Sequence, residues 1–293
     1  MPRYKTRYRD DGMSVPTTVR EPRSGWQPIN WRELLGYRDL LFFLVLRDIR
    51  GRYAQTVIGF GWAVIRPLFS MVVFSVVFGK LARIPSDGIP YPVFSFAALV
   101  PWTYFSTAMT QSTGSLISNA NLWTKVYFPR LVIPLTPALA GLVDFSIAFV
   151  MLGILMLFFG IAPTSGVLVL PYLVLLMFIT SAGVGMWLSS LAIKYRDVNH
   201  AIPFVAQILL YAAPVVWPMS LIGEQFPQWD PVIRQVYGLY PITGVIEGFR
   251  SGLLGTGPMP WDLIASGTVG ALVVFVSGAF YFRRMERTFA DVA

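Results

Sequence analysis

The sequence predicts an all-α integral membrane protein with six transmembrane helices. Of the 293 residues, 55% are hydrophobic and only 13% are charged, whereas soluble domains carry about 25% charged residues. Six segments are apolar over about the 20 residues that a helix needs to cross a bilayer, and none shows the alternation typical of a barrel strand. These segments are residues 56–79, 93–113, 132–158, 167–192, 201–222 and 263–282.

The chain begins with a basic tail and a segment too short to span the membrane. Residues 1–30 contain no apolar run typical of a cleavable signal peptide, and we assign them to a cytoplasmic tail. In residues 31–55, charged residues flank the apolar run Leu40–Leu46. This segment is therefore predicted to be an amphipathic helix at the membrane interface, and residues 56–293 form the transmembrane domain. On so apolar a chain, the basic tail favours contact with the membrane surface over nucleic acid.

The distribution of basic residues predicts the orientation of the helices. With the N-terminus inside, the inner segments carry 18 of the Lys and Arg residues and the outer loops carry four. Basic residues are enriched in cytoplasmic loops. We therefore expect both termini to lie in the cytoplasm.

A short helix is predicted between the second and third spans. Asn119 or Asn121 can cap its start, and Pro129 ends it. Its apolar residues are Leu122, Trp123, Val126, Tyr127 and Phe128. On a helix that projects into water these side chains form an exposed patch that needs a partner, with Trp123 and Tyr127 on one face.

A 40-residue outer segment, residues 223–262, follows the fifth span. It contains two helix-like pieces, opened by Pro231 and Pro241, because proline is favoured in the first turn. Both are too short to cross the bilayer, so we expect re-entrant or lid helices. Glu247 and Arg250 are three residues apart, a spacing that favours a salt bridge. They either brace an outer gate or form a solvated pair of little energetic effect. If they brace the gate, reversing both charges should restore the function that either single reversal loses.

Enzymatic chemistry has little support. The chain has no phosphate-binding loop of the GxxxxGK[ST] type, and its only adjacent acidic pair, Asp10 and Asp11, lies in the tail. It has no cysteine and one histidine, so no typical zinc site is available. We predict no catalytic residues, no metal site and no cofactor in this chain. A polyprenyl-linked glycan enzyme is an alternative, but it needs acidic loop motifs, and the inner loops offer only Asp197.

Two helix faces combine aromatic rings with a polar group. Their residues are Trp62, Arg66 and Phe69 in the first span, and Phe204, Gln207 and Tyr211 in the fifth. Sugars stack on aromatic rings and need hydrogen bonds for their hydroxyls, so these faces can line a substrate path. Ordinary helix packing is the alternative, with Arg66 reaching to the cytoplasmic interface. Asp144 is the other ionisable group within a span, and we expect it to bond to a neighbouring helix.

Five sequence stretches, in this order, resemble the membrane subunit of type-two ABC exporters. They are GWAVIRPLFSMVVFSVVFG, LVPWTYFS, SNANLWTKVYFPRLVIPL, KYRDV and YPITGVIEGFR. The resemblance extends from about Trp31 to Arg287 and is closest to the permeases that export O-antigen, capsule, teichoic acid or galactan. A type-two exporter of drugs or lipids is the alternative, and it often lacks the FPR and YRDV stretches.

The resemblance implies a homodimeric permease in the bacterial plasma membrane, with two separate ATP-binding cassette subunits on its cytoplasmic face. ATP and Mg²⁺ then belong to the partner, and the substrate is a lipid-linked polysaccharide. It also implies that residues 31–53 form the interface helix, that residues 121–129 lie in the coupling helix, and that the first and fifth spans line the conduit. Arg66 departs from the family, in which an uncharged residue is expected before Pro67.

Overall fold

The computed structural model describes residues 31–54, 59, 61–286 and 289. Over these residues it contains twelve α-helices, one π-helical segment and one 3-10 helix, with no β-strand. The predicted all-α class is confirmed for this part of the chain. The predicted tail, residues 1–30, lies outside the described residues.

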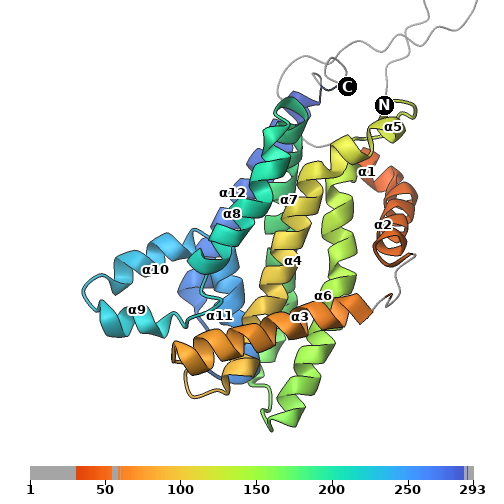
Figure 1. Cartoon of the computed structure of the whole chain (residues 1–293). Helices are drawn as coiled ribbons and strands as arrows, with labels where there is room; N and C mark the ends of the chain where they lie inside the picture. The colour runs from red at the N-terminus through yellow and green to blue at the C-terminus, as the bar shows by residue number, and fades with distance from the viewer. Residues whose placement is uncertain (1–30, 55–58, 60, 287–288, 290–293) are drawn as a thin grey trace, which may run out of the picture.

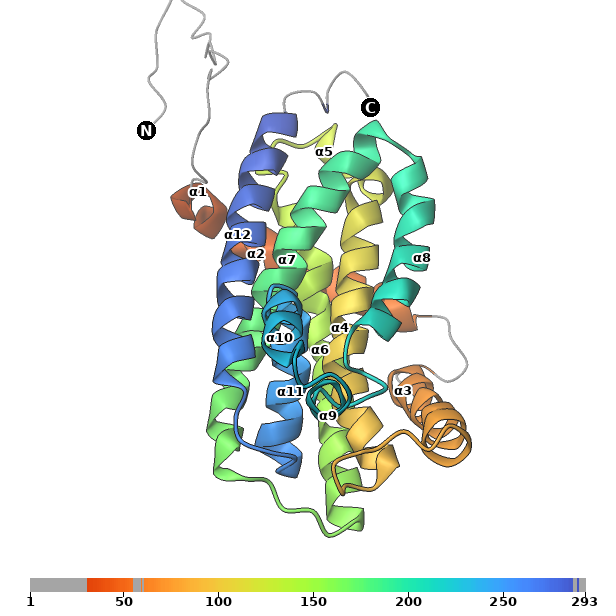
Figure 2. The same ribbon diagram turned by 90° about the vertical axis from the view of Figure 1, so that its left-hand side faces the viewer.

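Long helices pack side by side to form the body of the molecule (Figures 1 and 2). They are α4 (Tyr91–Ser118), α6 (Val132–Phe158), α7 (Leu170–Lys194), α8 (Asp197–Ala212) and α12 (Trp261–Met285). The apolar core lies between α4, α6, α7 and α11, where Phe105, Leu152 and Met177 are almost fully buried.

The pairing of α7 with α12 depends on two glycines. A Cβ atom added at Gly278 would lie 2.5 Å from the carbonyl oxygen of Gly183, and one added at Gly183 would lie 2.7 Å from the backbone of Phe275. Only glycine allows two backbones to approach so closely, as at other membrane helix contacts. Because the two backbones meet at Gly183 and Gly278, the turns of α7 and α12 that follow these glycines also lie side by side.

Among the described residues, four segments are long and apolar enough to cross a membrane, judged by length and composition: Gly61–Leu81, Val132–Phe158, Ser165–Lys194 and Trp261–Met285. Helix α4 has 28 residues but is interrupted by Ser, Thr and Gln, and it does not reach the same hydropathy. Of the six predicted spans, four are supported in this way.

The predicted fifth span, residues 201–222, is wrong in its extent. Helix α8 ends at Ala212, and Ala213 has an extended backbone (φ −76°, ψ 151°). Pro214 follows, and the residue before a proline is disfavoured in helical geometry. A separate short helix, α9 (Ser220–Gln225), begins after this turn.

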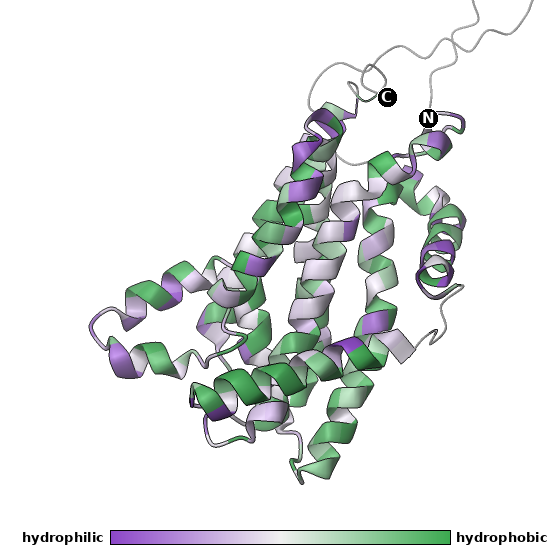
Figure 3. Ribbon diagram, viewed as in Figure 1, coloured by the Kyte–Doolittle hydropathy of each residue, from purple (hydrophilic) through white to green (hydrophobic). Residues whose placement is uncertain are grey.

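The first predicted span, residues 56–79, has an unexpected direction. Its described part forms α3 (Gly61–Phe74) and the π-helical segment η1 (Ser75–Leu81), and α3 runs across the bundle, not along it (Figures 1 and 2). None of its residues is buried, and Figure 3 shows hydrophobic residues along nearly its whole length. One side of α3 packs on α4 and α6, with Leu68, Met71 and Phe74 against the core, and its remaining apolar surface is not covered by the described part of the chain.

The outer segment folds as two helices with different environments. Helix α10 (Asp230–Gly238) projects from the bundle together with α9 (Figure 1). Helix α11 (Pro241–Leu254) is buried over almost its whole length between α4, α7 and α12. It begins at Pro241 as predicted and stops at Gly255, which takes the left-handed conformation (φ 69°) that glycine adopts without strain.

The remaining helices are short and lie at the side or the ends of the bundle. The predicted interface helix is divided into α1 (Trp31–Gly36) and α2 (Arg38–Tyr53), and α2 packs on α6. Helix α5 (Ala120–Trp123) lies at the same end of the bundle as the C-terminal end of α12 (Figure 1). The 3-10 helix η2 (Ser165–Val169) precedes α7.

Candidate functional site

The first predicted path face is exposed on α3. The side chains of Trp62 and Phe69 are 38% and 68% exposed. The guanidinium carbon of Arg66 lies 5.5 Å from the centre of the Trp62 ring, within the range of a cation–π interaction. The residues predicted to share this face therefore do so, with the charge of Arg66 held beside an aromatic ring.

The second predicted path face is exposed on α8. Phe204 and Tyr211 are 65% and 52% exposed, and Gln207 is exposed between them. By contrast, the neighbouring Ile202 is buried. The aromatic face of α8 is thus turned away from the core of its own chain.

The two helices that carry these faces, α3 and α8, lie on the same side of the bundle (Figures 1 and 2). Helix α3 packs on α4 and α6, whereas α8 packs on α4 and α7, so α4 lies between them. Aromatic rings exposed together on one side suit repeated stacking against sugar rings. The described residues contain no group of three His, Asp or Glu side chains placed to hold a metal ion.

The predicted coupling helix is shorter than expected. Helix α5 ends at Trp123, so the predicted helical spacing of Trp123 and Tyr127 is wrong. Trp123 is buried, whereas Tyr127 is 64% exposed. Phe128 is also buried and Leu122 is half-buried, so the expected apolar patch is only partly exposed.

The Trp123 side chain is held by its own chain. Its indole nitrogen donates a hydrogen bond to the carbonyl oxygen of Leu116 at 2.9 Å, and the Arg130 guanidinium lies over its ring at 4.5 Å. Phe289 packs against the same ring. Trp123 therefore anchors the segment, and Val126 and Tyr127, both exposed, form its outer surface.

A polar network joins α2 to the bundle. The Arg52 guanidinium donates to Asp144 on α6 and to Asp48 on α2, each at 2.6 Å, and the Tyr53 hydroxyl donates to the same Asp144 carboxylate. Burial, together with this hydrogen bond, raises the pKa of Tyr53, which keeps its hydroxyl a donor. Asp144 thus bonds to a neighbouring helix as predicted, but that helix is α2.

Sequence reasoning missed Arg52 and Tyr53 as partners of Asp144. The four-residue spacing of Asp48 and Arg52 was the available signal, since it favours an ion pair on one helix face.

Helix α2 also contacts the start of the predicted coupling segment: Arg47 donates to the side-chain oxygen of Asn119 at 2.5 Å. Asn119 is the residue between α4 and α5, so α2 contacts both α6 and the start of the coupling segment.

The predicted salt bridge between Glu247 and Arg250 is present, with 3.0 Å between Arg250 Nη1 and Glu247 Oε1. The alternative of a solvated pair is wrong: the Arg250 side chain is 0% exposed and that of Glu247 only 12% exposed. A buried ion pair requires further hydrogen bonds to offset the loss of hydration.

Those further bonds come from backbone carbonyl groups. The Arg250 guanidinium donates to Pro214 and Val215 at 2.6 and 2.7 Å, and to Trp217 at 3.2 Å. It also lies 3.6 Å from the centre of the Phe94 ring. Arg250 therefore holds the turn between α8 and α9 against α4 and α11. A carboxylate at position 250 cannot donate to these carbonyl groups, so we now expect that reversing both charges does not restore what either single reversal loses.

The comparisons with known proteins agree with one another. The model of the ABC-2 type transporter family matches residues 39–254. An O-antigen export system permease protein RfbA of Myxococcus xanthus is 30% identical over 195 residues, which cover 66% of this chain and 74% of that protein. A Klebsiella pneumoniae protein of the same name is 26% identical over 88% of this chain and 96% of its own length. The polysialic acid transport protein KpsM of Escherichia coli is 23% identical over 66% of this chain and 76% of its own length.

Proposed function

Since the chain belongs to the ABC-2 type transporter family, we propose that it is the permease subunit of an ABC transporter that exports a polysaccharide from a bacterial cell. The observation that carries this proposal is the family match over residues 39–254. Two relatives are named for O-antigen export and one for polysialic acid transport. A permease that is driven by a separate ATPase subunit needs no nucleotide-binding loop of its own.

The proposal includes six membrane crossings, made by α3 with η1, α4, α6, α7, α8 and α12. Because α3 runs across the bundle in the single chain, this proposal requires that α3 turn to lie along the other helices in the assembled transporter. Four of these segments have the length and composition of spans, and α4 is long enough to be a fifth, at about 1.5 Å per residue. The bias of basic residues toward one set of loops supports cytoplasmic termini in the plasma membrane. The α2 helix, with exposed Phe42 and Phe43, suits the membrane interface.

A homodimer accounts for the exposed faces of α3 and α8. Large apolar patches on a protein surface mark contacts with lipid or protein, and the aromatic rings on these helices face away from the core. We place the substrate path between two copies, where Trp62, Phe69, Phe204 and Tyr211 line it. A lipid-linked polymer must be threaded, and repeated stacking gives weak contacts that release easily. Arg66 can hold the lipid diphosphate through paired charge-assisted hydrogen bonds.

Coupling to two ATPase subunits is assigned to the exposed part of the segment after α5. Val126 and Tyr127 are 54% and 64% exposed, whereas Trp123 supports them from within. The contact between Arg47 and Asn119 links this surface to α2, and the Arg52–Asp144 pair links α2 to α6. Movement of the docking surface can thus reach the membrane helices through α2.

The proposed function is tested by deleting the gene and measuring cell-surface polysaccharide. Loss of the surface polymer, with accumulation of lipid-linked polymer inside the cell, and recovery on re-expression are expected. Unchanged surface polysaccharide with increased drug sensitivity would instead indicate the drug-exporting alternative. The purified chain alone should not hydrolyse ATP. Measurable ATP turnover would contradict the proposal that the ATPase activity belongs to a separate partner subunit.

A further inference from the structure

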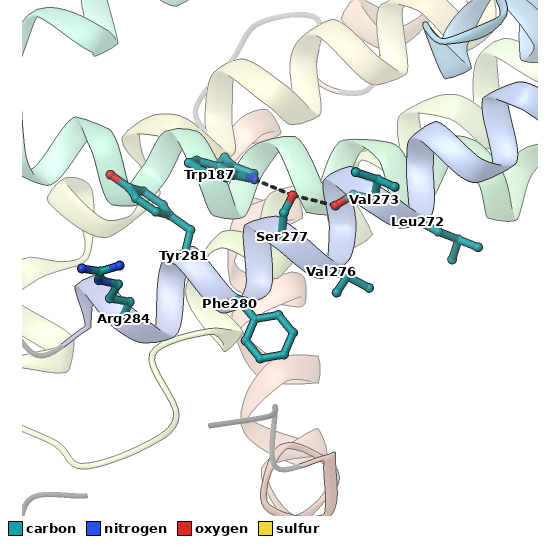
Figure 4. A pocket seen from close by; sticks show the side chains of 8 residues that line it. All are labelled: Trp187, Leu272, Val273, Val276, Ser277, Phe280, Tyr281 and Arg284. Atoms are coloured by element: carbon teal, nitrogen blue, oxygen red, sulfur yellow. Dashed lines mark hydrogen bonds between the residues drawn. The ribbon is translucent and has the colours of Figure 1, made fainter. Parts of the chain in front are cut away.

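A groove of about 590 Å³ lies on the outer face of α12, beside α7 (Figure 4). Figure 2 shows α12 at the opposite edge of the bundle from α3 and α8. Its lining residues are Trp187, Leu272, Val273, Val276, Ser277, Phe280, Tyr281 and Arg284. All but Trp187 belong to α12, where they recur on successive turns and so line a continuous strip.

The floor of the groove is a fixed aromatic surface. The rings of Trp187 and Tyr281 are stacked, with centres 4.1 Å apart and planes 15° from parallel. The indole nitrogen of Trp187 donates to the Ser277 hydroxyl at 3.1 Å, and that hydroxyl donates to the carbonyl oxygen of Val273 at 2.6 Å. These polar atoms are therefore already engaged, and this part of the groove suits a hydrocarbon chain better than a sugar, which needs hydrogen-bonding partners.

The other polar groups of the lining lie at one end of the groove. Figure 4 shows the guanidinium of Arg284 and the hydroxyl of Tyr281 at the same end of the row. A guanidinium has five N–H donors and can hold a phosphate while it keeps other contacts. From Leu272 to Arg284 the groove extends for about 18 Å at the helical rise, close to one leaflet, half of a hydrocarbon core of about 30 Å.

We propose that this groove binds one anionic phospholipid of the surrounding bilayer. Its acyl chain lies along Val273, Val276 and Phe280, and its phosphate is held by Arg284 at the end of α12. Charge complementarity and the one-leaflet length identify the occupant. This inference goes beyond polysaccharide export: it requires only that α12 crosses the membrane, and it is independent of the exported substrate.

The test uses the full-length chain in nanodiscs and phospholipids with brominated acyl chains, which quench tryptophan fluorescence on contact. The chain has nine tryptophans, so the signal of Trp187 is obtained as the difference between the natural chain and Trp187→Phe. Brominated phosphatidylglycerol should quench it at about fivefold lower mole fraction than brominated phosphatidylcholine, the effect of one basic charge near an anionic lipid. Arg284→Ala should abolish that preference, and Arg284→Lys should retain part of it.

Arg283→Ala is the matched control. Arg283 is ion-paired with Glu286 at 3.1 Å and does not line the groove, so its loss should leave the preference intact. Equal quenching by the two lipids, or equal losses in the two alanine variants, would overturn the proposal. The natural chain has no cysteine, so Val276→Cys adds a single cross-linking site. Efficient cross-linking between two copies through it would assign the groove to a second copy and also overturn the proposal.

Discussion

Replacing Arg250 with methionine removes the guanidinium that joins α11 to the α8–α9 turn. Breaking a buried ion pair costs about 3–5 kcal/mol, because the remaining charge stays buried; here that charge is Glu247, whose side chain is 12% exposed. The carbonyl groups of Pro214, Val215 and Trp217 also lose their donor. We expect Arg250→Met to destabilise the protein by about 4 kcal/mol.

Thermal unfolding of the purified chain in detergent, followed by tryptophan fluorescence, measures this effect. A loss of about 4 kcal/mol corresponds to a decrease in Tm of about 10 °C for a chain of this size. Arg234→Met is the matched control: its ion pair with Asp262 has side chains 32% and 55% exposed. Such exposed pairs contribute about 1 kcal/mol or less, so the control should change Tm by only a few degrees.

Two double variants separate the ion pair from the carbonyl contacts. Glu247→Gln combined with Arg250→Met should recover part of the lost Tm, because the unpaired buried charge is removed. The exchange Glu247→Arg with Arg250→Glu should not recover it, since a carboxylate cannot donate to the three carbonyl groups. Recovery of the natural Tm by the exchange, or an equal effect of Arg250→Met and Arg234→Met, would refute this reasoning.

Three further outcomes are expected. Tyr127→Ala should weaken co-purification of the ATPase subunit without lowering Tm, whereas Trp123→Ala should lower Tm by several degrees, as for a buried aromatic side chain; the reverse order in the two assays would contradict the assigned roles. Asp144→Asn should loosen α2, seen as faster amide hydrogen exchange in its last turn, because Arg52 loses its charged partner on α6 and keeps only Asp48 on its own helix; unchanged exchange would show that the Arg52–Asp144 pair does not hold the helix. Arg66→Ala should lower surface polysaccharide and Arg66→Lys should give an intermediate amount, since lysine keeps the charge but loses the paired hydrogen bonds; equal export by both variants and the natural chain would remove Arg66 from the path.

Helix positions and family were largely predictable from the sequence. The bounds of α11 follow from Pro241 at its start and Gly255 after its end, because both residues act through local backbone geometry. The exposed faces of α3 and α8 were predictable from side-chain spacing. The end of α8 was missed although Pro214 signals it, because the apolar run continues past the proline.

The pairing of polar groups was decided only by the tertiary structure. Arg52 and Asp144 are 92 residues apart, and Arg250 lies 36 residues from Pro214, distances at which no periodic pattern connects two positions. The exposure of Tyr127 and the burial of Trp123 depend on where α5 stops and on what covers it. A helix is specified by hydrogen bonds between residues four apart, and its apolar face by spacing along one element, so a sequence reports both. The partner of a buried charge is specified by how separate helices pack, and that becomes visible only when they are placed together.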